Sequence, residues 1–101
     1  MKLILKSKKN LHYATAEWDG GKITILAGSK INLALTYPKM SEDAKQAREN
    51  AELVDTNGIL LKDVQFNSVS TAAQFVTGRS SNGYIAWRPD DKMSLKEYLN
   101  K

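Results

Sequence analysis

A glycine turn between two β-rich segments is the feature that most constrains the fold of this chain. Asp19-Gly20-Gly21 separates residues 11–18 from residues 22–27, and both flanking segments contain β-branched or aromatic side chains. Glycine enters the left-handed backbone of a tight turn at low energetic cost, so the pattern predicts an antiparallel hairpin. Residues 2–6 also alternate between two faces, with Leu3 and Leu5 on one of them, and predict a further strand.

The first predicted helix starts at Ser41 and ends at Asn57-Gly58. Ser41 is a favourable N-cap, and the acidic residues after it complement the helix dipole. Glycine beyond the last periodic residue is typical of a helix end. One stripe of this helix is apolar and consists of Ala44, Ala47, Ala51 and Val54. We expect the charged side chains to form a solvated face, which consists of Lys45, Arg48, Glu49 and Glu52.

Two shorter helices are predicted further along the chain. Ser68 or Ser70 caps the first of them, and Gly78 closes it. Its apolar residues recur with the spacing of one buried face: Val69, Ala72, Ala73 and Val76. Ser94 and Glu97 match a capping box and predict the last helix.

Short extended segments and loops connect these helices. Residues 59–62 and 63–66 read as extended pieces, and residues 31–37 fit either an extended segment or a loop before Pro38. Residues 79–83 have the composition of a loop. Residues 84–88 are predicted as a strand that ends at Pro89.

Together these elements predict a small α+β fold. A mostly antiparallel sheet would be formed by the N-terminal hairpin and later strands, with one longer and two short helices packed on it. The 101 residues suffice for a single domain over residues 1–101, and two independent cores are not expected at this length. Hydrophobic residues make up 42% of the chain and charged residues 26%, which argues against disorder.

Composition argues against most metal and covalent chemistry. The chain has no cysteine, so it has no disulfide and no thiolate nucleophile, and one histidine cannot build a multi-histidine metal site. We expect that histidine, His12, to be a partly exposed strand residue rather than a catalytic base. Glu42-Asp43 and Asp90-Asp91 suit a helix start and a turn. We therefore expect no enzyme, no catalytic residue, no metal and no cofactor.

The charge balance favours an anionic partner. The 15 Lys and Arg residues exceed the 11 Asp and Glu residues, which gives a net charge of +4 and argues against an acidic DNA mimic. The densest positive run, at Lys6, Lys8 and Lys9, either attracts phosphates or only aids solubility. The N-terminal apolar run ends after Leu5, and no segment reaches the roughly 20 residues of a membrane span. We expect a cytoplasmic chain without a membrane partner.

Residues 66–88 hold the side chains that most suggest a binding site. They combine helix-capping serines, an arginine after a glycine, small residues whose amides can bind an anion, and aromatic rings. The nucleic-acid-binding candidates are Ser68, Ser70, Arg79, Ser80, Asn82, Gly83, Tyr84, Trp87 and Arg88. Structural alternatives stay open, since the serines can act only as caps, Asn82-Gly83 can be only a turn, and Trp87 can belong to the core. Among these candidates, Arg79 is the residue for which the sequence offers the least evident role in folding.

The run from Phe66 to Trp87 resembles the signature of a bacterial domain of unknown function, family 4357. That signature has a Ser-Pro-Ser-Ala-Ala-like helix start, then Gly-Arg-Ser, Asn-Gly, an aromatic residue and a tryptophan. The matching segments here are Ser68-Val69-Ser70-Thr71-Ala72-Ala73, Gly78-Arg79-Ser80, Asn82-Gly83-Tyr84 and Trp87, with Val69 in place of the proline. The likeness covers about residues 22–99, and its upstream parts are residues 25–30 and 58–60.

The resemblance implies an accessory module. Such domains accompany GIY-YIG nucleases or restriction-modification components, and the signature is similar to the restriction-enzyme and adenine-methylase associated domain, RAMA, whose members recognise DNA, in some cases with methylated adenine. We therefore expect a non-catalytic DNA-binding accessory module linked to restriction-modification or phage defence. Arg79, Arg88 and the N-terminal lysines would contact phosphates, and residues 80–84 would approach bases or backbone.

Two other interpretations stay open. One is a protein-interaction subunit that docks on a nuclease or methyltransferase, with its charge serving solubility. The other is a small enzyme that uses His12 as its base.

Overall fold

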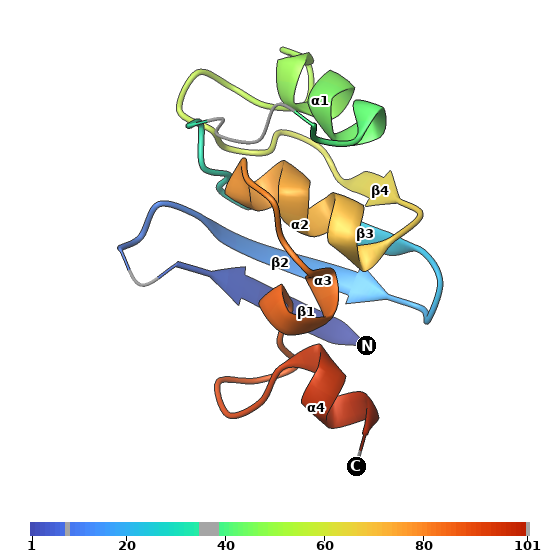
Figure 1. The fold of residues 1–101 in the computed structure, drawn as a ribbon. Helices are drawn as coiled ribbons and strands as arrows, with labels where there is room; N and C mark the ends of the chain where they lie inside the picture. Colours follow the sequence, from blue (N-terminus) through green and yellow to red (C-terminus); the bar gives the residue numbers. More distant parts are fainter. Residues whose placement is uncertain (8, 35–38, 101) are drawn as a thin grey trace.

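A four-stranded antiparallel sheet and four helices make up the computed structural model, which describes residues 1–7, 9–34 and 39–100 (Figure 1). The predictions for Lys8 and for residues 35–38 lie outside these ranges, whereas residues 31–34 are described and form neither a helix nor a strand. In chain order the elements are β1 (Lys2–Lys6), β2 (Tyr13–Trp18), β3 (Ile23–Ile25), α1 (Glu42–Glu49), β4 (Val64–Phe66), α2 (Val69–Thr77), α3 (Gly83–Ala86) and α4 (Leu95–Leu99). The small α+β fold predicted from the sequence is confirmed.

The sheet follows the order of the chain, β1-β2-β3-β4, and each neighbouring pair is antiparallel. Leu3 and Leu5 are buried on one face, as their alternation predicts. The hairpin between β2 and β3 is also confirmed. In its turn the Asp19 carboxylate accepts hydrogen bonds from the amides of Gly21 and Lys22, at 2.8 and 2.7 Å, which lowers the pKa of this carboxyl group.

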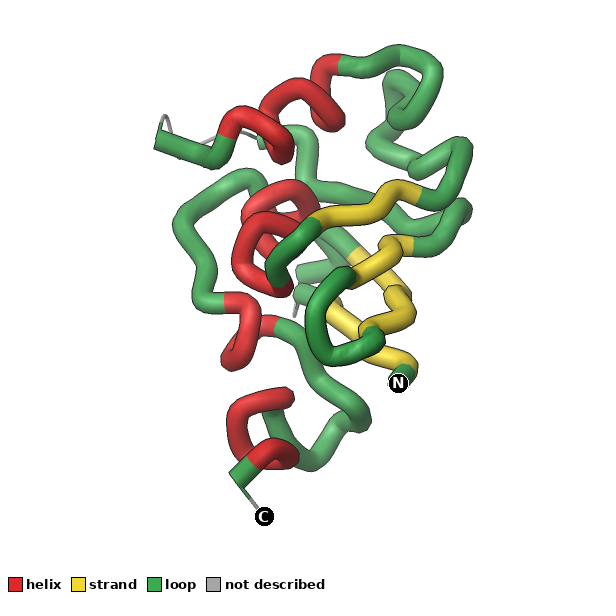
Figure 2. The backbone as a smooth tube through the Cα atoms, turned by 90° about the vertical axis from the view of Figure 1, so that its right-hand side faces the viewer, coloured by secondary structure: helices red, strands yellow, loops and turns green. Residues whose placement is uncertain are grey.

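Helix α2 packs against one face of this sheet (Figures 1 and 2). Ser68 caps it, since its Oγ accepts a hydrogen bond from the Thr71 amide at 3.0 Å. The helix ends at Gly78, which has a φ of 73°, a left-handed conformation that favours glycine. Six of its nine residues are buried: Val69, Ala72, Ala73, Phe75, Val76 and Thr77. The second predicted helix is therefore confirmed in its cap, its buried face and its end.

Helix α1 is shorter than predicted, because it ends at Glu49 and not at Asn57-Gly58. Asn50 leaves the helical conformation with a ψ of 107°, and its Oδ1 accepts a hydrogen bond from the Glu52 amide at 2.9 Å. An asparagine side chain that binds nearby backbone competes in this way with helix continuation. Ala51 is consequently exposed, and Val54 reaches the core from an isolated bridge to Leu60 rather than from a helix.

The polar residues of α1 also differ from their predicted roles. Ser41 occupies the N-cap position but its hydroxyl makes no capping bond; its amide donates to Gln74 Oε1 at 3.1 Å. Arg48 does not belong to a solvated face. Its guanidinium is half-buried and donates to the carbonyl oxygens of Phe75 and Asn32, which ties α1 to the end of α2.

The strand predicted at residues 84–88 is wrong, because residues 83–86 form the single-turn helix α3. Asn82 starts this turn by accepting a hydrogen bond from the Tyr84 amide at 3.0 Å, and only Arg88 pairs with a strand residue, Ile4. A strand would place Ile85 and Trp87 on one face. Trp87 is instead fully buried while Ile85 is 55% exposed.

The predicted extended segments differ in how far the structure confirms them, and the last predicted helix forms. Residues 64–66 form a strand, as expected, whereas Ile59 and Leu60 make only isolated bridges, to Lys30 and Val54. Helix α4 begins with the predicted capping box, in which Ser94 Oγ accepts from the Glu97 amide at 3.2 Å.

A close approach at Gly83 joins α3 to the first turn of α2. A Cβ atom at this position would lie 2.2 Å from the carbonyl carbon of Val69. The Gly83 amide donates to Ser70 Oγ at 3.0 Å, and the Trp87 indole donates to the Val69 carbonyl oxygen at 3.0 Å. The position therefore excludes any side chain.

We predict that Gly83→Ala lowers the free energy of unfolding by roughly 1–3 kcal/mol, because the added methyl group forces α3 away from α2. The matched control is Gly21→Ala, whose Cβ would meet its nearest atom, Asp19 Oδ1, at an ordinary 3.6 Å. The control should stay within about 0.5 kcal/mol of the wild type in urea denaturation. Equal effects of the two substitutions would contradict the close approach.

Candidate functional site

A cleft of about 510 Å³ lies where the connection between β1 and β2 faces the C-terminal end of α2. We call it the basic cleft. Its described lining contains three cationic residues and no acidic one: Leu5, Lys6, Ser7, Lys9, Leu11, His12, Thr77, Arg79, Ser81 and Ala86. Its volume lies within the range of roughly 300–1,000 Å³ that is typical of small-molecule sites.

The connection between β1 and β2 forms one wall of the basic cleft. The Ser7 hydroxyl accepts a hydrogen bond from the Leu11 amide at 2.6 Å, and the Ser7 amide donates to the His12 carbonyl at 3.2 Å. Asn10 adopts a positive φ of 56°, which lets the chain reverse within a few residues. These bonds turn the chain back so that Lys6, Lys9 and Leu11 all line the cleft.

The end of α2 forms the opposite wall. Thr77 Oγ1 donates to the Ala73 carbonyl at 2.9 Å and accepts from the Arg79 amide at 3.3 Å. The hydroxyl groups of Thr77 and Ser81 also form a hydrogen bond of 2.9 Å. The turn that carries Arg79 is thereby fixed to the last turn of the helix.

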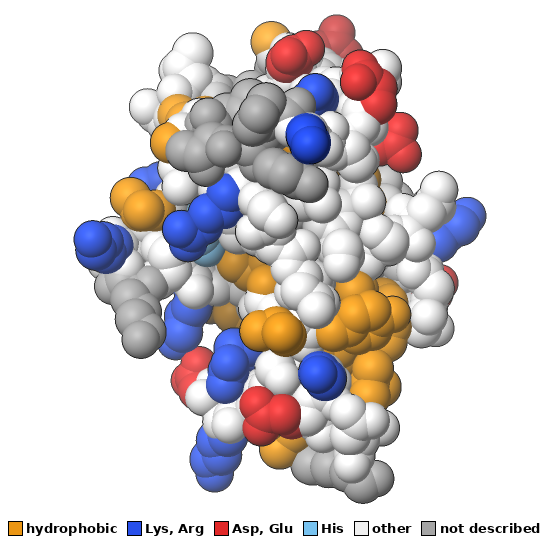
Figure 3. All heavy atoms as spheres, viewed as in Figure 1, with side chains coloured by type: hydrophobic (Ala, Val, Ile, Leu, Met, Phe, Trp, Pro, Cys, Tyr) orange, Lys and Arg blue, Asp and Glu red, His pale blue; other side chains and the backbone are white. Residues whose placement is uncertain are grey.

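His12 lies at the base of the basic cleft and is 3% exposed. Its Nδ1 is buried and has no hydrogen-bond partner within the described residues. Burial, and secondarily the positive charge of Arg79, lowers the pKa of the imidazole below its usual 6.5, so His12 is neutral at pH 7. Figure 3 shows basic side chains gathered on this side of the molecule.

The prediction of a partly exposed His12 is wrong. His12 precedes β2 in the alternation that buries Ala14 and Ala16, so it falls on the buried face. This alternation with a period of two is the sequence signal that could have placed His12 on the buried face. No comparable signal marks Ser7, Thr77 or Ser81, which sequence reasoning also missed, because their position depends on the contact between distant segments.

A second hollow, of about 350 Å³, continues from the basic cleft and is lined by Lys6, Ser7, Arg88 and Asp91. Lys6 Nζ forms an exposed ion pair with the Asp91 carboxylate at 3.0 Å, and Arg88 approaches the Asp91 carbonyl oxygen at 3.5 Å. Because Lys6 and Ser7 line both hollows, Arg79 and Arg88 belong to one continuous basic region.

Most of the other predicted site residues serve the fold. Ser68 and Asn82 cap helices, and the Ser70 hydroxyl accepts from the Gly83 amide. Gly83 is buried against α2, and Trp87 is fully buried and offers no ring face to a ligand.

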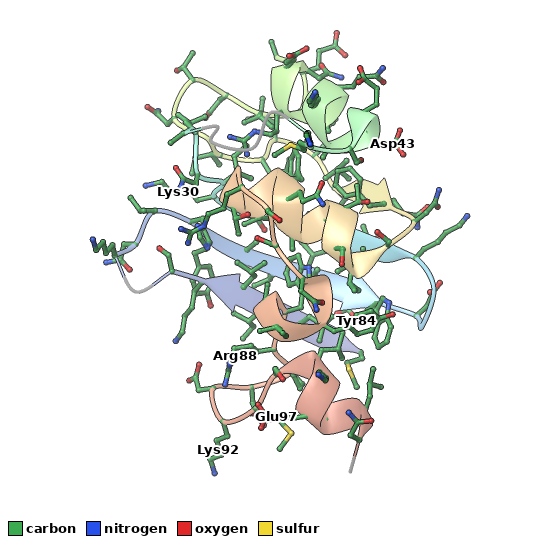
Figure 4. The ribbon with its side chains drawn as sticks, viewed as in Figure 1. Lys30, Asp43, Tyr84, Arg88, Lys92 and Glu97 are labelled. Atoms are coloured by element: carbon green, nitrogen blue, oxygen red, sulfur yellow. The ribbon has the colours of Figure 1, made fainter. Side chains whose placement is uncertain are left out.

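Two other candidates are exposed but do not line the basic cleft. Ser80 is exposed next to Arg79, although Ser81 and not Ser80 lines the cleft. Tyr84 packs edge-on against Trp18, with ring centroids 6.5 Å apart. Figure 4 places Tyr84 and Arg88 on opposite sides of α3. The nine candidates therefore do not form one surface, and only the two arginines belong to the basic region.

Residues 3–99 match the model of a family described as a domain of unknown function (DUF4357). The chain belongs to the DUF4357 family. Its match begins at Leu3, so the DUF4357 region includes β1 and the β1–β2 connection as well as α2, and thus both walls of the basic cleft. No curated protein and no solved structure matches the chain.

The described part of this DUF4357 chain has neither a metal-binding cluster nor a membrane-spanning helix. Residues 1–7, 9–34 and 39–100 contain no group of three or more histidine, aspartate or glutamate side chains that could hold a metal ion. In the same ranges no helix is long and apolar enough to cross a membrane.

We predict that acid destabilises the fold through His12. Since the folded chain holds the pKa of His12 below 6.5, the unfolded chain takes up the proton first as the pH falls. The free energy of unfolding should therefore be unaffected by His12 at about pH 8 and should decrease as the pH falls through 6.5 toward the folded pKa.

His12→Gln removes this titration and should flatten the pH dependence between about pH 8 and pH 5. Urea denaturation of both proteins across this range measures the difference. The same pH dependence in both would show that His12 is not held neutral by the fold.

Proposed function

We propose that this DUF4357-family chain is a non-catalytic DNA-binding accessory module that holds phosphates in the basic cleft. The observation that carries the proposal is that Lys6, Lys9 and Arg79 line one cleft with no acidic residue in its described lining. Cationic side chains that neutralise phosphates release the counterions condensed on DNA, and this release drives binding. Arg88, on the adjoining hollow, extends the same region along a backbone.

The charge distribution over the surface supports binding of DNA at the basic cleft. The acidic residues of α1, Glu42, Asp43 and Glu49, are exposed at the end of the molecule that carries α1, while basic side chains gather around the cleft (Figure 3). An anionic polymer is therefore attracted to the cleft and repelled from α1. Within the described residues Lys9 and Arg79 form no ion pair, so both cations are available to phosphates.

The state of the hydroxyl groups supports a binding role rather than catalysis. The hydroxyls of Ser7, Thr77 and Ser81 are all engaged in the turns that build the cleft walls. A serine or threonine nucleophile instead needs a base within hydrogen-bond reach to activate it, and no such bond to His12 occurs among the described residues.

The proteins with which this module acts are inferred from its resemblance to known accessory domains. Domains with a similar signature accompany GIY-YIG nucleases, and the RAMA domain accompanies restriction enzymes and adenine methylases. The proposed role is therefore to deliver a nuclease or methyltransferase activity, present on another polypeptide segment, to DNA in restriction-modification or phage defence. Such work takes place in the cytoplasm.

We predict that short duplex DNA binds the chain with a steep dependence on salt and that Arg79→Ala weakens this binding. Loss of one phosphate contact should reduce the slope of log K against log salt by about one. Lys22→Ala is the matched control, because Lys22 is exposed beside Trp18 at the other end of β2. Fluorescence anisotropy at two or more salt concentrations, with methylated and unmethylated adenine, measures both variants.

Absence of binding at low salt would contradict the DNA proposal and would favour the protein-interaction subunit. Equal losses in Arg79→Ala and Lys22→Ala would indicate an effect of net charge alone, and would remove the cleft from the interface.

A further inference from the structure

The shape of the basic cleft restricts the size of its ligand. A volume of about 510 Å³ exceeds what a single phosphate needs, whereas a duplex can only lie across such an opening. A ligand that fills the cleft is therefore the size of a small molecule or of one unit at the end of a polymer.

The two kinds of side chain in the cleft suit different parts of such a ligand. Lys6, Lys9 and Arg79 supply cations from both walls, while Leu5, Leu11 and Ala86 supply apolar surface. A nucleotide has the same division between an anionic phosphate and a nucleoside with apolar faces. Most small-molecule sites combine a largely apolar lining with a few polar groups in this way.

The cations that line the cleft also restrict the charge of the ligand. Of the three cations in the lining, Lys6 is paired with Asp91, whereas Lys9 and Arg79 form no ion pair within the described residues. Two unpaired cations attract a group with more than one negative charge. A phosphate monoester carries up to two negative charges near neutral pH, because its second pKa is about 6, whereas a phosphodiester carries one. His12 lines the same cleft, and its buried Nδ1 has no hydrogen-bond partner within the described residues.

We propose that the basic cleft binds one nucleotide through a terminal phosphate monoester, with the phosphate at Lys6, Lys9 and Arg79. The nucleoside lies against Leu5, Leu11 and Ala86. Two sources share this chemistry, the phosphorylated end of a strand and a free mononucleotide. The inference rests on the proposed function where the source is a strand end, and it stands alone where the source is a mononucleotide.

The test compares single-stranded thymidine oligonucleotides that carry a 5′-phosphate, a 3′-phosphate or no terminal phosphate. Binding is measured by fluorescence anisotropy, with thymidine 5′-monophosphate, thymidine and inorganic phosphate as competitors. We expect one phosphorylated strand to bind roughly tenfold more tightly than the unphosphorylated strand, which is the effect of a charge-assisted contact. Thymidine 5′-monophosphate should compete better than thymidine or inorganic phosphate.

Arg79→Ala and Lys9→Ala should each reduce the preference for the terminal phosphate, and Lys22→Ala should preserve it. Arg79, Lys9 and Lys22 are exposed, and urea denaturation confirms that each variant is folded. Two lining residues are tested so that a structural effect of either substitution does not decide the result.

The outcomes separate this inference from the proposed function. Equal binding of all three strands, weakened by Arg79→Ala, would overturn the monoester site and leave DNA binding intact. Competition by thymidine equal to that by its monophosphate would also overturn it. Binding of thymidine 5′-monophosphate without binding of any single strand or of duplex DNA would support the nucleotide site and overturn the DNA-binding function.

Discussion

The burial of α2 is the constraint on which the rest of the structure depends. This helix packs on the sheet with most of its residues inside the core, so it cannot shift without exposing apolar surface. Its first turn is held by the Trp87 indole and by the close approach of Gly83. At its other end Arg48 donates to the Phe75 carbonyl, and Gly78 ends the helix where an added Cβ would overlap the Ala34 carbonyl oxygen. Both ends are therefore fixed in position.

A fixed α2 explains why the basic cleft has a defined shape. Arg79 follows the helix directly and is tied to Thr77, so it meets the β1–β2 connection at one place. The cleft also has features that oppose folding, since it clusters three cations and buries an imidazole nitrogen without a partner. Departures of this kind from a well-satisfied interior concentrate at functional sites.

The sequence predicts elements whose signals are local. The Asp19-Gly20-Gly21 turn and the caps of α2 are set by residues within a few positions of one another, and they form as expected. Failures occur where local signals compete or where distant segments meet. In α3 the Asn82 cap outweighs the β-propensity of residues 84–88. The cleft itself joins residues about 70 positions apart, so the sequence identifies Arg79 as unexplained but not His12 as its neighbour.

The most direct test of the basic cleft as the binding site is NMR with an isotope-labelled chain and short DNA. The imidazole resonances of His12 and the amide of Arg79 should shift on titration, because both residues line the cleft. The indole resonance of Trp18, which packs against Tyr84 apart from the cleft, should stay unchanged. Shifts at Trp18 with none at His12 would place the ligand on another surface and contradict the assignment.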